Sequence, residues 1–148
     1  MAKDPLKKEQ PAPAPYEDNH KLVPLVFVVT VINDHQSYAI VDLLNQQEAA
    51  IACIMHARGT APSHFYEVVG FDGTLKQVVV AILKQDKWPA YKLSLQERFA
   101  VSPYAKGIAF TIPIDAVAGV SIYKMLANMQ VIDRPIKPKK SLIGGKKA

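Results

Sequence analysis

A doubled pattern of strand, helix and strand constrains this chain more than any other feature of its sequence. The first copy runs from an apolar stretch at Leu25–Ile32, through a polar break and a helix-like stretch, to a second apolar stretch near Ala49–Met55. The second copy has the same order between apolar stretches at Leu75–Leu83 and Gly107–Ile114. Two such units in series predict an α+β ferredoxin-like sandwich of order βαββαβ with a four-stranded antiparallel sheet.

The helices expected in both copies are amphipathic. Their apolar side chains recur at helical spacing: Ile40, Leu43 and Leu44 in the first, and Trp88, Tyr91, Leu95 and Phe99 in the second. Asp34 and Asp86 stand just ahead of these helices, and we expect each carboxylate to cap the first turn. Each helix should therefore pack one apolar face against the sheet.

The sequence divides into four segments. Residues 1–22 hold four prolines among Ala, Lys, Glu and Gln, a composition that predicts a disordered lead-in. The ferredoxin-like domain is expected over residues 23–120, followed by a short amphipathic helix over 121–132. Residues 133–148 carry six basic side chains against one Asp and predict a basic, disordered tail.

The charge distribution excludes several partners. The net charge is +5, but residues 25–132 hold eight basic and eight acidic side chains. A balanced domain offers no basic face for nucleic acid. No apolar run approaches the roughly 20 residues that cross a bilayer, and the N-terminus lacks the apolar core of a secretory signal, so no membrane insertion is expected. Together with the single Cys53, these features favour a cytoplasmic location.

The strands are apolar on both faces, which is unusual for a sheet that two helices cover on one side. Val26–Val29 and Val78–Leu83 are the clearest cases, because apolar residues occupy successive positions. A monomer rarely exposes an apolar patch of this size, so the second face needs a cover. Self-association is the favoured cover, and the alternative is the short C-terminal helix of the same chain.

Two short motifs, set in this element order, resemble those of the PII-type nitrogen-regulatory proteins and of their divergent PII-like branch. Arg58-Gly59-Thr60 leaves the second strand, and Lys106-Gly107 opens the fourth. The resemblance covers residues 23–120. It implies a homotrimer whose sheets line a central core. It also implies that small effectors bind in clefts between subunits, where the loop after strand two meets the loop before strand four.

The resemblance also assigns candidate ligand-binding residues. Arg58, Gly59 and Thr60 match the start of the family's effector loop, and Lys106 and Gly107 match the end of its nucleotide-binding loop. An Arg and a Lys at one cleft suit a phosphate or carboxylate, because the guanidinium offers a planar fork and the ammonium a point charge. The alternative is that both cations are solvated residues at strand ends.

Other positions depart from the family's pattern. The glycine-rich phosphate loop is replaced by Ala100–Ala105, in which Pro103 has no N–H to donate. The arginine pair expected after the fourth strand is replaced by Asp115–Ala118. The resemblance implies an adenine nucleotide as one candidate effector, whereas these two departures remove groups that would bind its phosphates. The identity of any cofactor therefore stays open.

These features predict a non-enzymatic regulatory protein that binds a small anionic effector and signals to a partner protein through the Gly59–Thr74 loop. One alternative is a divalent metal-binding trimer of the cation-tolerance type, with His56 and His64 as ligand candidates, although no tight Cys/His spacing is present. The other alternative is a purely structural trimer. The sequence shows neither a nucleophile elbow nor a fixed carboxylate pair, so no catalytic residue is expected.

Overall fold

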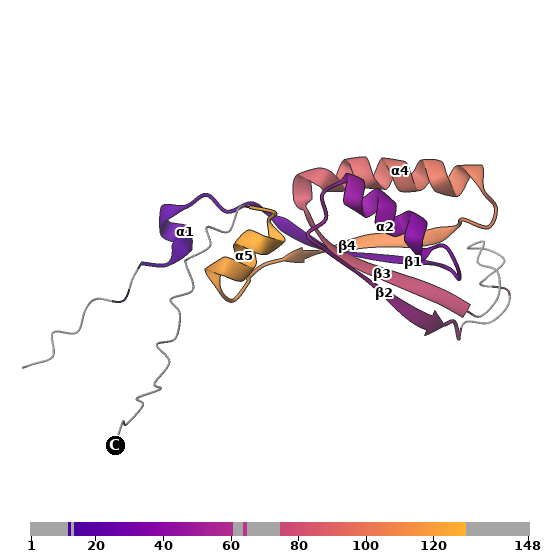
Figure 1. Ribbon diagram of the computed structural model, residues 1–148, viewed down its shortest axis with the longest axis horizontal. Coiled ribbons are helices and arrows are strands. Elements are labelled where there is room, and N and C mark those ends of the chain that lie inside the picture. Colours follow the sequence, from indigo (N-terminus) through magenta and orange to yellow (C-terminus); the bar gives the residue numbers. More distant parts are fainter. Residues whose placement is uncertain (1–11, 13, 61–63, 65–74, 130–148) are drawn as a thin grey trace, which may run out of the picture.

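The computed structural model describes residues 12, 14–60, 64 and 75–129. Their elements follow the expected doubled order, with one short helix before it and one after it (Figure 1). The elements are α1 (Tyr16–Asn19), β1 (Leu25–Asn33), α2 (Ser37–Gln46), β2 (Ile51–Arg58), β3 (Leu75–Lys84), the 3-10 turn η1 (Gln85–Lys87), α4 (Trp88–Val101), β4 (Gly107–Ile114) and α5 (Val120–Leu126). The predicted βαββαβ order is confirmed.

The four strands form one antiparallel sheet in the order β2-β3-β1-β4. Helices α2 and α4 lie across one face of this sheet (Figure 1). This is the ferredoxin-like arrangement that the sequence predicts. Because β1 and β3 are central, β2 and β4 form the two edges, and the loops that follow β2 and precede β4 leave from opposite edges.

The main core lies between the two helices and the sheet. Val28, Ile40 and Val79 are fully buried there, since alternate strand residues point toward the helices. Within this core the hydroxyls of Thr30 and Tyr91 form a hydrogen bond of 2.8 Å. Burial raises the pKa of Tyr91 to about 12, and the hydrogen bond with Thr30 opposes that effect in part. The bond ties α4 to the central strand β1.

Helix α2 begins differently from the expectation. Asp34 Oδ1 accepts a hydrogen bond from the N–H of His35 at 3.0 Å, and no side chain caps the helix at Gln36. His35 has a left-handed φ of 63°, so the chain turns before the helix starts and Asp34 lies too early to cap it. Instead, the N–H of Ser37 donates to Gln77 Oε1 of β3 at 3.1 Å. A neighbouring strand thereby satisfies a donor that a local cap would otherwise satisfy.

Helix α4 also lacks the expected cap. Asp86 lies within η1, and Lys87 occupies the N-cap position of α4 without a side-chain hydrogen bond. Pro89 stands in the first turn, where a missing N–H carries little cost. The intervening 3-10 turn is the reason that the sequence pattern placed the helix start too early.

Helix α5 ends at Leu126, earlier than the expected 132. Asn128 adopts a left-handed φ of 53°. Its N–H bonds to Met125 O at 3.1 Å, and the N–H of Met129 bonds to Lys124 O at 2.8 Å. These two bonds form a Schellman motif, which ends the helix while satisfying its last carbonyl groups.

Helix α1 lies within segment 1–22, for which no regular structure was expected. The Tyr16 ring stacks on His20 with centroids 4.0 Å apart, and it lies 6.1 Å from the ring of Tyr123 in α5. Tyr123 Oη also accepts the N–H of Val23 at 2.6 Å. Contacts with α5 therefore position this turn. Most of segment 1–22 before it, and the tail expected over 133–148, lie outside the described residues.

Candidate functional site

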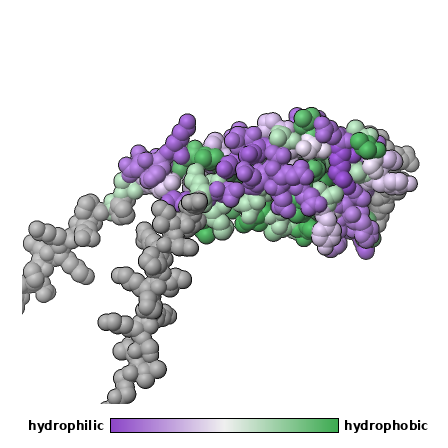
Figure 2. All heavy atoms as spheres, turned by 45° about the horizontal axis from the view of Figure 1, so that its top comes forward, coloured by the Kyte–Doolittle hydropathy of each residue, from purple (hydrophilic) through white to green (hydrophobic). Residues whose placement is uncertain are grey.

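The sheet face opposite the helices is apolar, and we call it the open face. Twelve residues from the four strands form three rows across it. The rows are Ile51, Ile82, Phe27 and Ile112; Cys53, Val80, Val29 and Phe110; and Met55, Val78, Val31 and Ile108. On edge strand β4, Phe110 is 45% and Ile112 is 49% exposed. The helix-covered side is largely hydrophilic by contrast, with hydrophobic atoms gathered along its lower margin (Figure 2).

Helix α5 covers only one end of the open face. Tyr123 and Leu126 form a second, small core with Leu25, and Ile82 and Ile114 pack against it. Figure 1 shows α5 at the end of the sheet where β1 begins and β4 ends. In the part of the chain that the structure describes, a cover from the same chain is therefore limited to this end.

The opposite end of the sheet gathers basic side chains from three strands. β2 ends at Arg58, Lys76 is the second residue of β3, and Lys106 directly precedes β4. Asn33, the last residue of β1, pairs with Lys76 in the strand register. We call Arg58, Lys76 and Lys106, together with Asn33, the cationic sheet end. The register pairs Arg58 with Leu75 and Lys76 with Ala57, so the side chains of Arg58 and Lys76 leave opposite faces of the sheet. Together the three cations give this end of the sheet a positive charge, which attracts anions.

Lys76 was not among the residues predicted from the sequence. It is 4% exposed, and its Nζ donates to Asn33 Oδ1 at 2.8 Å. Asn33 Nδ2 in turn donates to Tyr104 O at 3.1 Å, which links the loop before β4 to the central strands. A lysine this buried is rare and needs partners. The sequence offered one sign of this role, a lysine at the start of an otherwise apolar strand. A lysine at a strand end usually faces solvent, so this sign did not predict burial.

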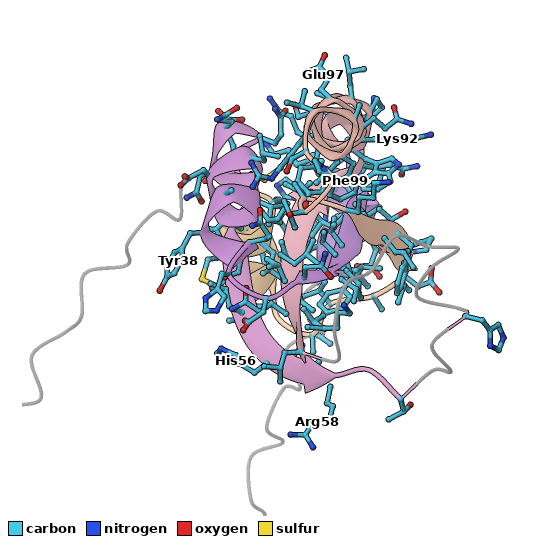
Figure 3. All side chains as sticks on the ribbon, turned by 90° about the vertical axis from the view of Figure 1, so that its right-hand side faces the viewer. Tyr38, His56, Arg58, Lys92, Glu97 and Phe99 are labelled. Carbon is cyan, nitrogen blue, oxygen red and sulfur yellow. The ribbon has the colours of Figure 1, made fainter. Side chains whose placement is uncertain are left out.

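Arg58 and Lys106 share the cationic sheet end but lie on opposite edges of it. They are three strand spacings apart, which corresponds to about 14 Å between backbones. Both residues are exposed, and the Arg58 side chain points away from the sandwich (Figure 3). In one chain, the central strands with Lys76 and Asn33 separate the two cations, so they do not form a close pair.

Gly107 has a packing role beside the ligand role that the resemblance implies. A Cβ atom there would lie 2.5 Å from Val31 O, 2.8 Å from Ile32 Cγ2 and 3.1 Å from Phe99 Cζ. Figure 3 shows Phe99 pointing from α4 toward the sheet. A side chain at 107 would therefore collide with the backbone of β1 and also press on Phe99 of α4.

The other two candidates follow Arg58 directly. Gly59 is half-buried and Thr60 is exposed. They begin the Gly59–Thr74 loop, most of which lies outside the described residues. The predicted ligand-binding residues thus form two groups, one after β2 and one before β4, on opposite edges of the sheet.

Neither a metal centre nor a membrane-spanning helix is found in the described part of the chain. His56 on β2 and His64 are both exposed, and no three His, Cys, Asp or Glu side chains come together there in a way that could hold a metal ion. None of the described helices is long and apolar enough to cross a bilayer.

Comparisons with known structures find the same fold in two groups of proteins. CPII, a nitrogen regulatory PII-like protein from Thiomonas intermedia K12, matches in a structure bound to ADP, AMP and acetate. It has a TM-score of 0.53 and 18% identity, covering 70% of this chain and 97% of CPII. A second CPII structure, bound to ADP, AMP and bicarbonate, gives a TM-score of 0.52 with 15% identity over 68% of this chain and all of CPII.

CutA1 proteins match equally well. CutA1 from Oryza sativa has a TM-score of 0.53 and 13% identity, covering 72% of this chain and 94% of that protein. The divalent ion tolerance protein CutA1 from Ehrlichia chaffeensis has a TM-score of 0.50 and 12% identity over the same shares. The predicted resemblance to the divergent PII-like branch is thus confirmed at the level of the fold, which CutA1 shares.

Sequence comparisons add one short match. The pyruvate dehydrogenase E1 component subunit alpha of Acholeplasma laidlawii is 36% identical over an alignment of 84 residues that covers 53% of this chain. The match spans 23% of that protein, so the chain corresponds to about a quarter of the length of this curated relative. No protein-family model matches the chain.

Proposed function

We propose that this protein is a cytoplasmic, non-enzymatic PII-like signalling protein that forms a homotrimer and binds a small anionic effector between subunits. Adenine nucleotides and small carboxylates or bicarbonate are the candidate effectors, because CPII structures hold ADP, AMP, acetate and bicarbonate. The effector would favour one state of the Gly59–Thr74 loop over another, and that state would engage a partner protein in nitrogen regulation. The observation that carries this proposal is the cationic sheet end on a PII-like fold.

The open face supports self-association. Three rows across four strands form one contiguous apolar surface. Monomers commonly expose single apolar side chains but rarely expose a contiguous patch of this size. Burial of apolar surface stabilises an assembly by about 25 cal/mol per Å². A closed ring of three subunits removes all three open faces from water together.

Assembly would also explain how Arg58 and Lys106 can serve one site although they lie on opposite edges of the sheet. If the β2 edge of one subunit approaches the β4 edge of the next, Arg58 and the partner subunit's Lys106 line one cleft. An anion would then be bound by groups from two chains, which couples effector binding to assembly.

Isothermal titration with ADP, AMP, bicarbonate and acetate tests the effector site. We expect at least one anion to bind, and we expect Arg58→Ala and Lys106→Ala each to weaken that binding by about tenfold. Lys92→Ala is the matched control, because Lys92 is an exposed cation that points outward from α4 (Figure 3). If the wild-type protein binds none of the four anions, the proposal that they are its effectors is wrong.

A mixing experiment tests whether the cleft lies between subunits. Arg58→Ala and Lys106→Ala proteins are unfolded together, refolded at equal concentration and titrated. If each cleft uses one residue from each neighbour and the subunits mix at random, each mixed trimer regains one cleft with both cations, which is about a quarter of all clefts in the refolded sample. Recovery of that fraction of high-affinity sites is expected, whereas a site built within one chain would recover none.

The similarity to CutA1 favours one second candidate, a divalent metal-binding trimer. Metal analysis of tag-free protein after exposure to copper or zinc would then find a stoichiometric ion that is lost in His56→Ala. His35→Asn is the control, since Asn tolerates the left-handed backbone that His35 adopts. A trimer that binds neither the anions nor the metals would instead support the purely structural alternative.

A further inference from the structure

A cavity of about 500 Å³ lies at the end of the sheet that is remote from the cationic sheet end. Its walls come from four segments: α1, the residues before and at the start of β1, the turn after β4, and α5. The register places Leu25 opposite Ile114 at this end, while Asn33 and Gly107 mark the other end. The cavity is therefore separate from the proposed effector site.

The walls of this cavity are held by specific contacts. Tyr123 in α5 accepts the N–H of Val23 at 2.6 Å and lies beside the Tyr16 ring. Leu25 is buried beneath, in the small core that Tyr123 and Leu126 share. The volume is within the range of pockets that bind small molecules, which are mostly apolar with a few polar groups. The cavity is thus a formed feature of the fold.

The lining has a distinct chemical character. Leu25, Ile114 and Val117 contribute an apolar surface, and the only charged side chains among the lining residues are the carboxylates of Glu17 and Asp115. Neither carboxylate takes part in an ion pair in the part of the chain that the structure describes. Lys124 of α5 is engaged with the face of the Tyr16 ring, with its Nζ 5.5 Å from the ring centroid. Lys21 lines an adjoining pocket and is not among the residues that line this cavity.

We propose that this cavity binds a small organic cation, namely an amine with an apolar body. The carboxylates of Glu17 and Asp115 stand on two different walls, α1 and the turn after β4, and attract the ammonium group. The apolar residues receive the body of the ligand. An anion of the same size is repelled, so the two ends of the sheet select ligands of opposite charge. This proposal does not depend on the proposed function.

Isothermal titration of the full-length protein with 2-phenylethylamine tests the site, with 2-phenylethanol and phenylacetate as neutral and anionic analogues. We expect the amine to bind about tenfold more tightly than the alcohol at low salt, and phenylacetate not to bind. Glu17→Gln and Asp115→Asn should each weaken amine binding severalfold and leave alcohol binding unchanged. Equal affinity for amine and alcohol, or no amine binding at about 10 mM amine, would overturn the proposal.

A filled-cavity variant localises the binding. Ala116 is exposed and lines the cavity, so Ala116→Trp should abolish amine binding without disturbing a core. Ala118→Trp is the matched control, because Ala118 is exposed but does not line the cavity. Circular dichroism verifies that both variants fold. Unchanged amine binding in folded Ala116→Trp would place the amine elsewhere and overturn the assignment.

Discussion

The two faces of the sheet are made from the same strands and are both largely apolar, yet they differ in how they are covered. Neighbouring residues illustrate the difference: Val79 is fully buried beneath the helices, whereas Val80 belongs to the middle row of the open face. The covered face owes its burial to contacts within one chain. Among the described residues, the open face has such contacts only near α5. Apolar composition alone therefore does not distinguish a finished core from a surface that requires a partner.

The largest effect is expected from a charge on the open face. Val80→Lys places an ammonium group in the middle row, where assembly would bury it without a partner, so the proposed trimer should dissociate to single subunits. Sedimentation velocity at micromolar concentration measures the change. Leu93→Lys is the control, since Leu93 is 58% exposed on α4 and its replacement should leave the mass unchanged. A wild-type protein that sediments as a monomer would contradict the proposal that the open face is covered by other subunits.

A smaller but local effect is expected on the covered face at Gly107. Gly107→Ala forces a Cβ against Val31 O and the Ile32 side chain, so we expect the free energy of unfolding to fall by about 3 kcal/mol. Urea denaturation measures the loss. The adjacent open-face variant Ile108→Ala provides the comparison, because it creates no clash. Gly107→Ala with wild-type stability would show that β4 can shift relative to β1 at little cost.

The matched pair Val79→Ala and Val80→Ala sharpens the comparison further. Val79→Ala removes buried methyl groups from the covered core and should cost about 2 kcal/mol at any protein concentration. Val80→Ala should cost stability mainly through assembly, so its effect should depend on protein concentration. Denaturation at two concentrations a hundredfold apart separates the two cases. Identical concentration dependence for both variants would contradict a shared interface on the open face.

The smallest effect concerns the hydrogen bond inside the covered core. Tyr91→Phe leaves Thr30 Oγ1 without its partner and should cost about 1 kcal/mol at neutral pH. Because burial raises the pKa of Tyr91 to about 12, the folded state holds the phenol proton more tightly than the unfolded state does. The contribution of protonated Tyr91 to the free energy of unfolding is therefore fully present below pH 10. It is lost between pH 10 and 12, at up to about 1.4 kcal/mol per pH unit.

Denaturation of wild-type and Tyr91→Phe proteins between pH 8 and about 11.5 separates this contribution from that of other groups. The wild-type protein should lose more stability than the variant above pH 10. Parallel curves would show that the phenol is better solvated than its burial indicates.

Much of the fold was predictable because it depends on periodicity. The doubled pattern gave the element order, and the apolar residues of α4 pack as their spacing indicated: Tyr91 and Leu95 are buried. Boundaries were less predictable. β2 was expected near Ala49–Met55 but occupies Ile51–Arg58, because Glu48 adopts a left-handed φ of 60° and closes α2 in a Schellman motif. Glycine or Asn usually marks such a position, and Glu gives no such signal.

The candidate site was predictable only in part. The motifs placed Arg58 and Lys106 at loops that meet one end of the sheet, and the structure has both there. Their positions on opposite edges follow from the strand order β2-β3-β1-β4, which element order alone does not reveal. Lys76 was missed because its burial depends on Asn33, a residue 43 positions away that only the strand register brings beside it.

Cys53 occupies the middle row of the open face, beside Val80, and its thiol is exposed in the single chain. A ring that sequesters this row would shield the sulfur from a colorimetric thiol reagent. The rate of colour development would then report how many subunits are dissociated at any moment, without a label or a substitution. If the proposed ring forms, the reactivity of Cys53 is thus a direct measure of the assembly state of the unmodified protein.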